Sequence, residues 1–451
     1  MTSKMNRRRF LATSAMGATA LGLTAKKISA ANDPKPAYDS ANDKITIGMI
    51  ATGARAVDLI NAIKDCNGTE IVALCDAYKG RVERALERIG GRVKDYNNYR
   101  KIIDMKDIDM VVISSPDHLH ARHVIDAMDA GKHVYIEKPL TYSVAEGIEI
   151  IKAARRNKVA VQVGSTGVSS PLSAKAREIV ASGKLGQITM VRAYNNRNSA
   201  EGAWIYPIPP DATKETVNWE MFLGSAPKRP FNLERFFRWR CYKDYSGGIT
   251  TDLFVHLCNS INYIMGVEMC KAVTGMGGLY RWKESREVPD TINASLEYPE
   301  GFMVNISSTF NNQKGTGSGL SIHGTEGTLE FGGGKLTFTP EIIHEDNGWV
   351  VRSWPSKLEK AYYDNPENKF REQPWTRPPR ALEGGEVWES EGIDATTLHF
   401  QEIFDAIRNG TPTKEDAVVG HHAAACAHMV NMSIEQGRMV YWDKDKDLVK
   451  K

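Results

Sequence analysis

The sequence contains few cysteines, and their spacing argues against two common kinds of scaffold. Six occur in 451 residues, at Cys66, Cys75, Cys241, Cys258, Cys270 and Cys426. None of them forms a CxxC pair or another spacing typical of a zinc site. Cys75 lies in an apolar strand pattern and Cys258 in a helical one. We therefore expect buried free thiols rather than a disulfide framework, and no metal site built on cysteine.

The sequence also lacks a surplus of either charge and a long apolar run. It has 58 Lys and Arg residues against 55 Asp and Glu residues, so the composition does not favour a polyanion as a partner. The weakly apolar segment 10–25 is too short and too polar to span a bilayer stably. We expect a globular protein of two or three domains, with neither a nucleic-acid partner nor stable membrane insertion.

The N-terminus contains, in order, the parts of an export signal. Arg7 and Arg8 precede the weakly apolar segment, and small residues follow it at Ala30 and Ala31. This order resembles a twin-arginine signal peptide, which we predict over residues 1–31, with cleavage after Ala30 or Ala31 and a periplasmic location. Its removal changes the formal net charge from +3 to −3, because it contains six basic residues and no acidic one. The alternative is a basic, disordered N-terminus.

The rest of the chain divides into a linker and two predicted domains, which together indicate an α/β protein. Residues 32–43 form a polar, proline-containing linker. In residues 44–165, the apolar runs ITIGMI, EIVALCD, DMVVISS, HVYIE and AVQVG alternate with helical patterns, which predicts a parallel-sheet Rossmann domain. In residues 166–451, longer alternating runs such as ITMVRAYNN and FMVNISSTF predict an α+β domain with a large, open, mixed or antiparallel sheet. We assign substrate binding and oligomerisation to this second domain.

The second domain also contains an unusually long irregular segment. The stretch from Glu345 to about Thr396 is rich in Pro, Trp and charged residues, and its length suggests a lid or an interface arm. Two helical patterns then end the chain, LHFQEIFDAIRNG and VVGHHAAACAHMVNMSIEQG, each closed by a glycine.

The turn after the first strand of the Rossmann domain has one glycine where a dinucleotide fingerprint has three. The three fingerprint positions are Ala51, Gly53 and Ala56, so the middle glycine, which lets the backbone approach a pyrophosphate, is kept. Asp76 ends the next strand, where an acidic side chain accepts the ribose hydroxyls and disfavours a ribose phosphate. The turn therefore predicts NAD, with NADP less favoured. The alternative is an ordinary strand–helix turn followed by a solvated aspartate.

Two further motifs resemble a known family. The stretch SSPDHLHARHVIDAMDAGKHVYIEKPLT, residues 114–141, contains the triplet Glu137-Lys138-Pro139, and SGGITTDLFVHLCN contains Asp252 and His256. Their order and separation resemble the glucose-fructose oxidoreductase/inositol dehydrogenase family, and the resemblance covers nearly the whole chain after the signal. It implies an NAD-dependent sugar oxidoreductase. It also implies that the cofactor-binding residues are Ala51, Gly53, Arg55, Asp76, Ser115, Pro116, His120, Glu137 and Lys138.

The catalytic candidates are Lys138, His256 and Asp252. Lys138 lies at the carboxyl end of a sheet strand, where α/β folds bind ligands, and a cationic nicotinamide nearby would favour loss of its proton. Thr250 or Thr251 is expected to cap a helix that carries Asp252 and His256 on one face, four residues apart. Lys138 and His256 are then the acid/base groups and Asp252 orients a hydroxyl. The alternatives are a surface salt bridge for Lys138 and a helix-face ion pair between Asp252 and His256.

Three other features leave alternatives open. His118, His120 and His123 suggest a metal site, but no acid or cysteine cluster completes it, so we predict no metal. The run NLERFFRWRCYKDY, with Trp204 and Trp219 upstream, is either a sugar-stacking platform or part of the core. The family tends to have Gln and Arg after its fifth strand, where this chain has GSTGVSS, so substrate contacts there are open.

The function we predict is oxidation of a secondary alcohol of a sugar or glycoside by hydride transfer to NAD. Because no dinucleotide pool is expected outside the cytoplasmic membrane, we predict that the cofactor stays tightly bound, and we expect a homo-oligomer. One alternative is an NAD-dependent glycosidase of the same superfamily; the related exported hydrolases replace the Glu-Lys-Pro triplet, so Lys138 favours the dehydrogenase. The other is a carbohydrate-binding protein with a vestigial nucleotide site.

Overall fold

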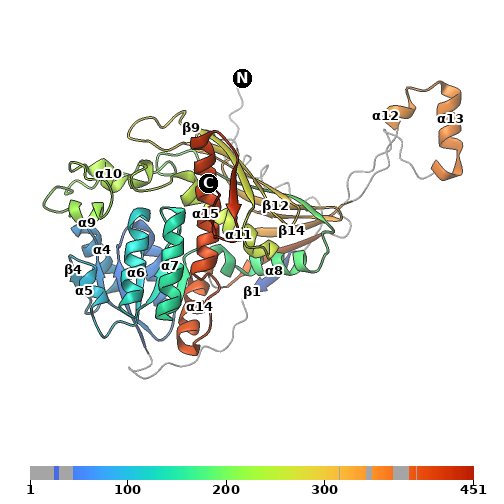
Figure 1. The fold of residues 1–451 in the computed structure, drawn as a ribbon. Helices are drawn as coiled ribbons and strands as arrows, with labels where there is room; N and C mark the ends of the chain where they lie inside the picture. The colour runs from blue at the N-terminus through green and yellow to red at the C-terminus, as the bar shows by residue number, and fades with distance from the viewer. Residues whose placement is uncertain are drawn as a thin grey trace, which may run out of the picture.

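The computed structural model describes residues 25–29, 44–313, 315–341, 348–368, 385–392 and 394–450. Two sheets dominate these residues, one parallel with six strands and one mixed with eleven (Figure 1). Among the described residues, no helix is both long and apolar enough to cross a membrane. The predicted linker 32–43 and most of the predicted signal peptide, including its cleavage site, lie outside the described residues.

The parallel sheet confirms the predicted Rossmann-type fold. Its order is β4-β3-β2-β5-β6-β7. The strands are β2 (Ile45–Ile50), β3 (Thr69–Cys75), β4 (Lys94–Tyr96), β5 (Met110–Ile113), β6 (His133–Ile136) and β7 (Val161–Val163). The crossover helices are α3 (Ala54–Lys64), α4 (Lys79–Ile89), α5 (Arg100–Ile103), α6 (His120–Asp129) and α7 (Val144–Asn157). Strands β2, β5 and β6 are almost wholly buried because helices cover both faces, which explains their unbroken apolar runs.

The second sheet confirms the predicted large mixed sheet. Its order is β1-β15-β14-β13-β12-β8-β11-β10-β9-β16-β17, with β16 at Val440–Asp443 and β17 at Leu448–Val449. Among the described strands, only β8 and β11 and the edge strands β1 and β15 pair in parallel. The central strands are β8 (Ile188–Asn196), β9 (Ala272–Gly278), β10 (Thr291–Glu297), β11 (Met303–Thr309), β12 (Gly317–Gly324), β13 (Gly327–Gly332) and β14 (Lys335–Pro340). Buried and exposed residues alternate along β10 and β11. One face of this sheet therefore packs on the core and the other is open.

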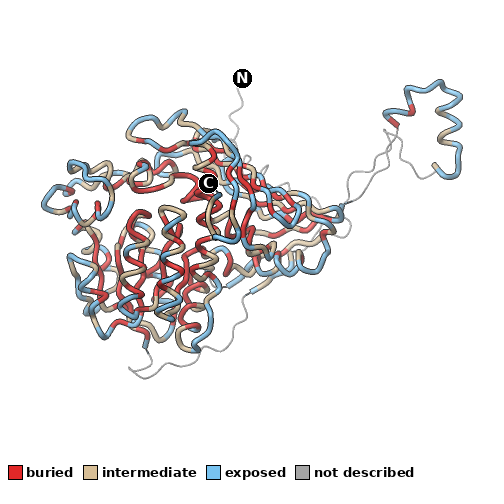
Figure 2. Tube along the Cα trace, in the orientation of Figure 1, coloured by how far each residue is buried: buried red, intermediate tan, exposed pale blue. Residues whose placement is uncertain are grey.

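Three helices cover the inner face of the large sheet: α8 (Pro171–Ala181), α11 (Val255–Met265) and α15 (Ala417–Gln436). A fourth helix, α14 (Ala395–Asn409), packs on the parallel sheet instead. Phe400, Ile403 and Phe404 of α14 pack on the parallel sheet with Leu59 of α3. The chain thus returns to the Rossmann domain before it adds the last two strands of the large sheet, β16 and β17. Figure 2 shows the buried residues concentrated in the parallel-sheet layer and between the large sheet and its helices.

Parts of the long segment from Glu345 to Thr396, for which the composition suggests a lid or an interface arm, form regular structure. Its residues 386–391 form β15, which pairs antiparallel with β14 and so belongs to the sheet. Helices α12 (Gly348–Val351) and α13 (Ser356–Asp364) lie beyond the β14 end of the sheet, apart from the parallel sheet (Figure 1). This arrangement gives no support for a lid over the dinucleotide turn. Alternation in the short run EVWESE is too brief to predict a strand from sequence.

Part of the predicted signal peptide forms an edge strand. β1 (Lys26–Ser29) runs parallel to β15, and Lys26 and Lys27 form ion pairs with Glu386 and Glu391. Cleavage after Ala30 or Ala31 would remove this strand and leave β15 at the edge.

The two layers meet at a buried polar network around Glu415, whose side chain is almost fully buried. Asn259 Nδ2 of α11 donates to Glu415 Oε2 at 2.5 Å, and Val163 N of β7 donates to the Glu415 carbonyl at 2.8 Å. Burial raises the pKa of Glu415 to about 8, with smaller contributions from the nearby carboxylates of Asp416 and Glu402.

This raised pKa predicts a pH-dependent stability. The unfolded chain releases the Glu415 proton near pH 4.5, whereas the folded protein holds it to about 8. Stability is therefore unaffected below pH 4.5 and is lost as the pH rises toward 8. Glu415→Gln should remove this loss of stability. The free energy of unfolding of the variant minus that of the wild type should therefore be larger at pH 8.5 than at pH 5, by at least about 1 kcal/mol. Urea denaturation at several pH values measures it, with the exposed Glu149→Gln as the control; equal pH slopes would contradict the assignment.

Candidate active site

The turn between β2 and α3 has the backbone of a phosphate-binding loop despite its missing first glycine. Ala51 adopts a left-handed conformation, with φ of 67°, and its N–H donates to the carbonyl of Cys75 on β3 at 2.8 Å. Only glycine takes this conformation without strain, which explains the glycine preference at the first fingerprint position. Alanine keeps the required geometry here at a cost of roughly 1 kcal/mol.

Gly53 supplies the open backbone that a pyrophosphate needs. It is the N-cap residue of α3, with no side-chain cap. A Cβ at this position would meet only the guanidinium side chain of Arg81, at 3.7 Å or more. The first-turn N–H groups of α3 therefore face an open space at the positive end of the helix dipole, an arrangement that fits a bound anionic diphosphate.

Asp76 stabilises the turn, in addition to lining the hollow beside it. Its carboxylate accepts hydrogen bonds from Thr52 N at 2.7 Å and Tyr78 N at 2.8 Å, and Arg81 Nη1 lies 3.9 Å away. The sequence suggested ribose hydroxyls as its partners. Each oxygen keeps a lone pair for such a ligand, because a carboxylate has about four acceptor sites.

A hollow of about 220 Å³ lies against this turn at the carboxyl ends of the parallel strands. Six of the residues that the sequence assigned to cofactor binding line it: Ala51, Gly53, Arg55, Asp76, Ser115 and Pro116. His120 does not, because it is buried and its two ring nitrogens contact the carbonyls of Pro139 and Ser115, at 2.6 and 2.7 Å. His120 therefore supports the ends of β5 and β6 from behind the hollow.

The other two histidines of this loop are also used in separate contacts. His118 Nε2 contacts the carbonyl of Phe222 at 2.8 Å, and His123 Nδ1 contacts Ser115 Oγ at 3.0 Å. Burial lowers the pKa of His118 to about 4 and that of His123 to about 3. Within the described ranges, no three His, Cys, Asp or Glu side chains are grouped to hold a metal ion.

The Glu137-Lys138 pair after β6 connects the dinucleotide turn to the second domain. Arg55 Nε of α3 donates to Glu137 Oε1 at 2.8 Å. Lys138 Nζ donates to both Asp252 Oδ1 and the Asp252 carbonyl at 2.9 Å. The lysine is thus not a surface salt bridge, because only 11% of its side chain is exposed.

Asp252 lies in a π-helical turn, η5 (Thr250–Phe254), that precedes α11. The expected cap is wrong in detail: Thr250 and Thr251 lie inside this turn, with their hydroxyls bonded to Gly247. Gly248 lies just before the turn, where φ is 73° and a Cβ would lie 2.8 Å from Val288 Cβ, so only glycine fits.

Three charged side chains meet at this turn. Arg240 Nε donates to Asp252 Oδ1 at 2.9 Å, the same oxygen that binds Lys138. Burial alone would raise the pKa of Asp252, but the two cations outweigh it and hold that pKa well below its usual range. Asp252 is therefore a permanent carboxylate between two cations.

His256 is held neutral at physiological pH. Desolvation lowers its pKa to about 3, and the positive charge of Lys138 adds to the effect. No hydrogen bond joins His256 to Asp252 in the described residues, so the helix-face ion pair that the spacing allowed is not formed. The unprotonated ring is the form that can accept a proton, although a pKa this far below neutrality makes it a weak base.

Lys138, Asp252 and His256 line one hollow of about 280 Å³, which shares Arg55, Ser114, Ser115, Tyr206, Trp239 and Arg240 with the dinucleotide hollow. Sequence reasoning missed Tyr206 and the buried Asp117, and it named Trp239 and Arg240 only within the aromatic and Arg-rich run. Arg240 stacks on Trp239, 4.2 Å from its ring centre. No spacing rule connects these residues to Lys138, because separate loops carry them.

The two upstream tryptophans of the proposed sugar platform belong to the core instead. Trp204 is almost fully buried against Phe310, and Trp219 Nε1 donates to the carbonyl of Arg229 at 2.8 Å. Neither lines the hollow, whereas Tyr206 and Trp239 do. Of the segment GSTGVSS, Thr166 lines it.

The fold and this site define a dinucleotide-binding Rossmann protein with a second α+β domain, whose helical segments η5 and α11 supply Asp252 and His256. The sequence matches the family model described as "Oxidoreductase family, NAD-binding Rossmann fold" over residues 45–165 and the "GFO/IDH/MocA C-terminal domain" over residues 222–330. The chain belongs to the Gfo/Idh/MocA family of oxidoreductases.

Known relatives match in sequence over about a third of the chain. Inositol 2-dehydrogenase of Salmonella typhimurium (strain LT2) is 34% identical over 152 residues, 33% of this chain and 45% of the relative. Alpha-N-acetylgalactosaminidase of Shewanella oneidensis is 31% identical over 175 residues, 34% of this chain and 38% of that protein. The chain thus spans less than half the length of these relatives.

Solved structures match over most of the chain. Levoglucosan dehydrogenase in complex with NADH and levoglucosan has a TM-score of 0.64 at 18% identity, covering 88% of this chain and 99% of its own. The WlbA dehydrogenase from Bordetella pertussis, in complex with NADH and UDP-GlcNAcA, has a TM-score of 0.64 at 17% identity, covering 89% and 99%. At these identities the likeness establishes the fold.

The left-handed backbone conformation of Ala51 leads to a testable prediction about the stability of the protein. Ala51→Gly should stabilise the protein by about 0.5–1 kcal/mol, because glycine removes the strain at φ of 67°. Ala54→Gly, in the first turn of α3, is the matched control and should be neutral or destabilising. Thermal unfolding of both variants tests the prediction; a lower melting temperature for Ala51→Gly would contradict it.

Proposed function

We propose that the protein oxidises a secondary alcohol of a sugar or glycoside by hydride transfer to NAD. The observation that carries the proposal is the convergence of Lys138, Asp252 and His256 on one hollow that adjoins the turn at Gly53. The similarity to inositol 2-dehydrogenase and the family's NAD-binding domain support this assignment.

The chain's own residues can handle the proton. Bound NAD would accept the hydride from the sugar carbon. The neutral imidazole of His256 takes the proton of the sugar hydroxyl. Lys138 Nζ uses two of an ammonium group's three N–H donors on Asp252, so the third is available to hold the sugar oxygen. Asp252 then positions Lys138, rather than orienting the sugar hydroxyl itself as first expected.

Loss of either group should slow the reaction without unfolding the protein. Lys138→Ala and His256→Ala should each lower kcat by about a hundredfold or more. Lys152→Ala, an exposed lysine of α7, is the control and should leave kcat unchanged. NADH formation with the best substrate of a sugar panel is measured, together with the melting temperature. A folded variant with near-normal turnover would remove that residue from the mechanism.

We also propose that NAD stays bound through the catalytic cycle and that NADP is disfavoured. Phe236, Phe237 and Trp239 of the second domain line the hollow at the turn, opposite the residues of the Rossmann domain. Trapped NADH would be reoxidised in place by a second carbonyl substrate, which gives ping-pong kinetics.

Protein purified without added cofactor and then denatured should release close to one NAD per chain. An enzymatic cycling assay of the supernatant measures it, with extensively dialysed protein in parallel. Cofactor-free protein that works only with added, readily dialysed NAD would contradict tight binding while leaving the reaction intact.

Two properties of the whole protein complete the proposal. Export by the twin-arginine route to the periplasm rests on Arg7 and Arg8; their replacement by Lys should leave unprocessed protein in the cytoplasm, and unchanged secretion would refute it.

Self-association through the open face of the large sheet is supported by the exposed side chains of Tyr194, Met276 and Met303. Light scattering on the purified protein tests for the oligomer.

An NAD-dependent glycosidase is a second candidate, favoured by the similarity to alpha-N-acetylgalactosaminidase. Mass spectrometry after incubation with glycosides separates the two: a product lighter by two hydrogens indicates oxidation, and a released aglycone indicates cleavage. A carbohydrate-binding protein without activity would give neither product; the assembled Lys138–Asp252 pair argues against it.

A further inference from the structure

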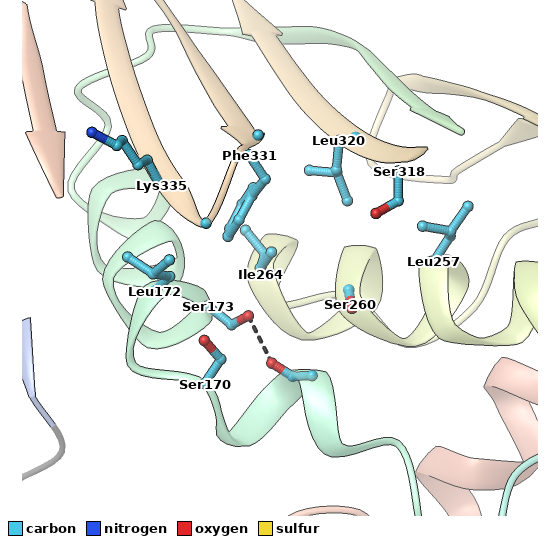
Figure 3. A pocket seen from close by; sticks show the side chains of 15 residues that line it. Ser170, Leu172, Ser173, Leu257, Ser260, Ile264, Ser318, Leu320, Phe331 and Lys335 are labelled. Carbon is cyan, nitrogen blue, oxygen red and sulfur yellow. Dashed lines mark hydrogen bonds between the residues drawn. The ribbon is translucent and has the colours of Figure 1, made fainter. Parts of the chain in front are cut away.

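A second hollow, of about 320 Å³, lies between the inner face of the large sheet and helices α8 and α11 (Figure 3). We call it the α8–α11 hollow. Its lining residues are Gly167, Ser170, Leu172, Ser173, Leu257, Ser260, Ile264, Ser318, Gly319, Leu320, Phe331, Gly332, Gly333, Gly334 and Lys335. It is therefore built by the second domain and by η3 (Thr166–Ser169), the segment that follows β7.

The α8–α11 hollow borders the candidate active site along two chain segments. On η3, Thr166 lines the active site and its neighbour Gly167 lines the hollow. On α11, His256 lines the active site, while Leu257, Ser260 and Ile264 line the hollow. At about 100° per residue, these four side chains fall within one sector of about 100° on the helix. Ser260 lies about 6 Å along the helix axis from His256.

The boundary between the two spaces is formed by small residues. A Cβ at Gly167 would lie 3.3 Å from Ser260 Oγ, so η3 and α11 are in contact there. Gly167 has no side chain and Ser260 has only a hydroxymethyl group, so the partition between the two spaces is thin at this point.

The chemistry of the hollow fits a neutral sugar ring. The hydroxyls of Ser170, Ser260 and Ser318 make no hydrogen bond within the described ranges, whereas Ser173 Oγ donates to the Gly167 carbonyl at 2.7 Å. Figure 3 shows Phe331 projecting between the two helices, beside Leu172 and Ile264. Hydroxyl partners around an aromatic and aliphatic surface suit a pyranose, which has a polar rim and apolar C–H faces.

The charges in the lining of the hollow also favour a neutral ligand. Lys335 is the one charged residue in the lining, and it forms an ion pair with Glu389. A phosphate or carboxylate ligand would therefore find no free cation in the hollow.

We propose that the α8–α11 hollow is a second saccharide subsite, which holds the neighbouring sugar unit of a glycoside while its first unit is oxidised beside Lys138 and His256. This inference rests on the proposed function, and it names the substrate class as disaccharides or longer glycosides rather than free monosaccharides. Phe331 and the serine hydroxyls bind the second unit.

The test compares binding and turnover in the NAD-saturated protein. The probes are a panel of disaccharides and, for each, the methyl glycoside of its oxidisable sugar. Ser260→Leu fills the hollow, and Ser260→Ala is the matched variant that removes the hydroxyl without filling the space. Isothermal titration calorimetry gives affinities and NADH formation gives kcat/KM.

The wild type should prefer a disaccharide over its methyl glycoside by about tenfold or more. Ser260→Leu should abolish this preference and leave the methyl glycoside unchanged, while Ser260→Ala should have the smaller effect. Equal use of both ligands by the wild type, or an unchanged disaccharide preference in Ser260→Leu, would overturn the subsite even if sugar oxidation is established. Disaccharide binding that Ser260→Leu abolishes, without NADH formation from any sugar, would support the subsite and refute the proposed oxidation.

Discussion

The ion pair between Lys138 and Asp252 is the contact on which the active site depends. It joins the end of a strand in the parallel sheet to a helical turn of the second domain, through two 2.9 Å hydrogen bonds. Both side chains are nearly buried, so removing either partner would leave an uncompensated charge at the domain boundary. This contact therefore links the placement of the two domains to the geometry of the site.

The same pair determines the electrostatics of the site. Lys138 and Arg240 keep Asp252 ionised despite its burial, and the positive charge of Lys138 adds to desolvation in keeping His256 neutral. A fixed ion pair and a neutral imidazole in one hollow separate two roles, holding the sugar oxygen and accepting its proton. The π-helical turn lets Asp252 present both its carboxylate and its carbonyl to one lysine.

The dinucleotide turn shows how far a sequence fingerprint can vary while its geometry is retained. Ala51 takes the backbone conformation that glycine normally provides, and Asp76 holds the following amides in place. Gly53 is the fingerprint position that remained glycine. A side chain there would occupy the space in front of the first turn of α3. Strain at one residue is thus accepted where close approach of a ligand is not required.

The sequence by itself determined most central strands of both sheets, the family, the glycine-poor turn and the three candidate residues Lys138, Asp252 and His256, because periodicity and local motifs are short-range properties. It could not provide β15, the return of α14 to the parallel sheet, or the role of Arg240, since each depends on residues far apart in the chain. His120 and Trp204 illustrate the same limit: their residue types suited a site, but packing turned them toward carbonyls and the core. Only the tertiary structure decided which polar side chains share the hollow, because burial and partner choice arise from long-range packing.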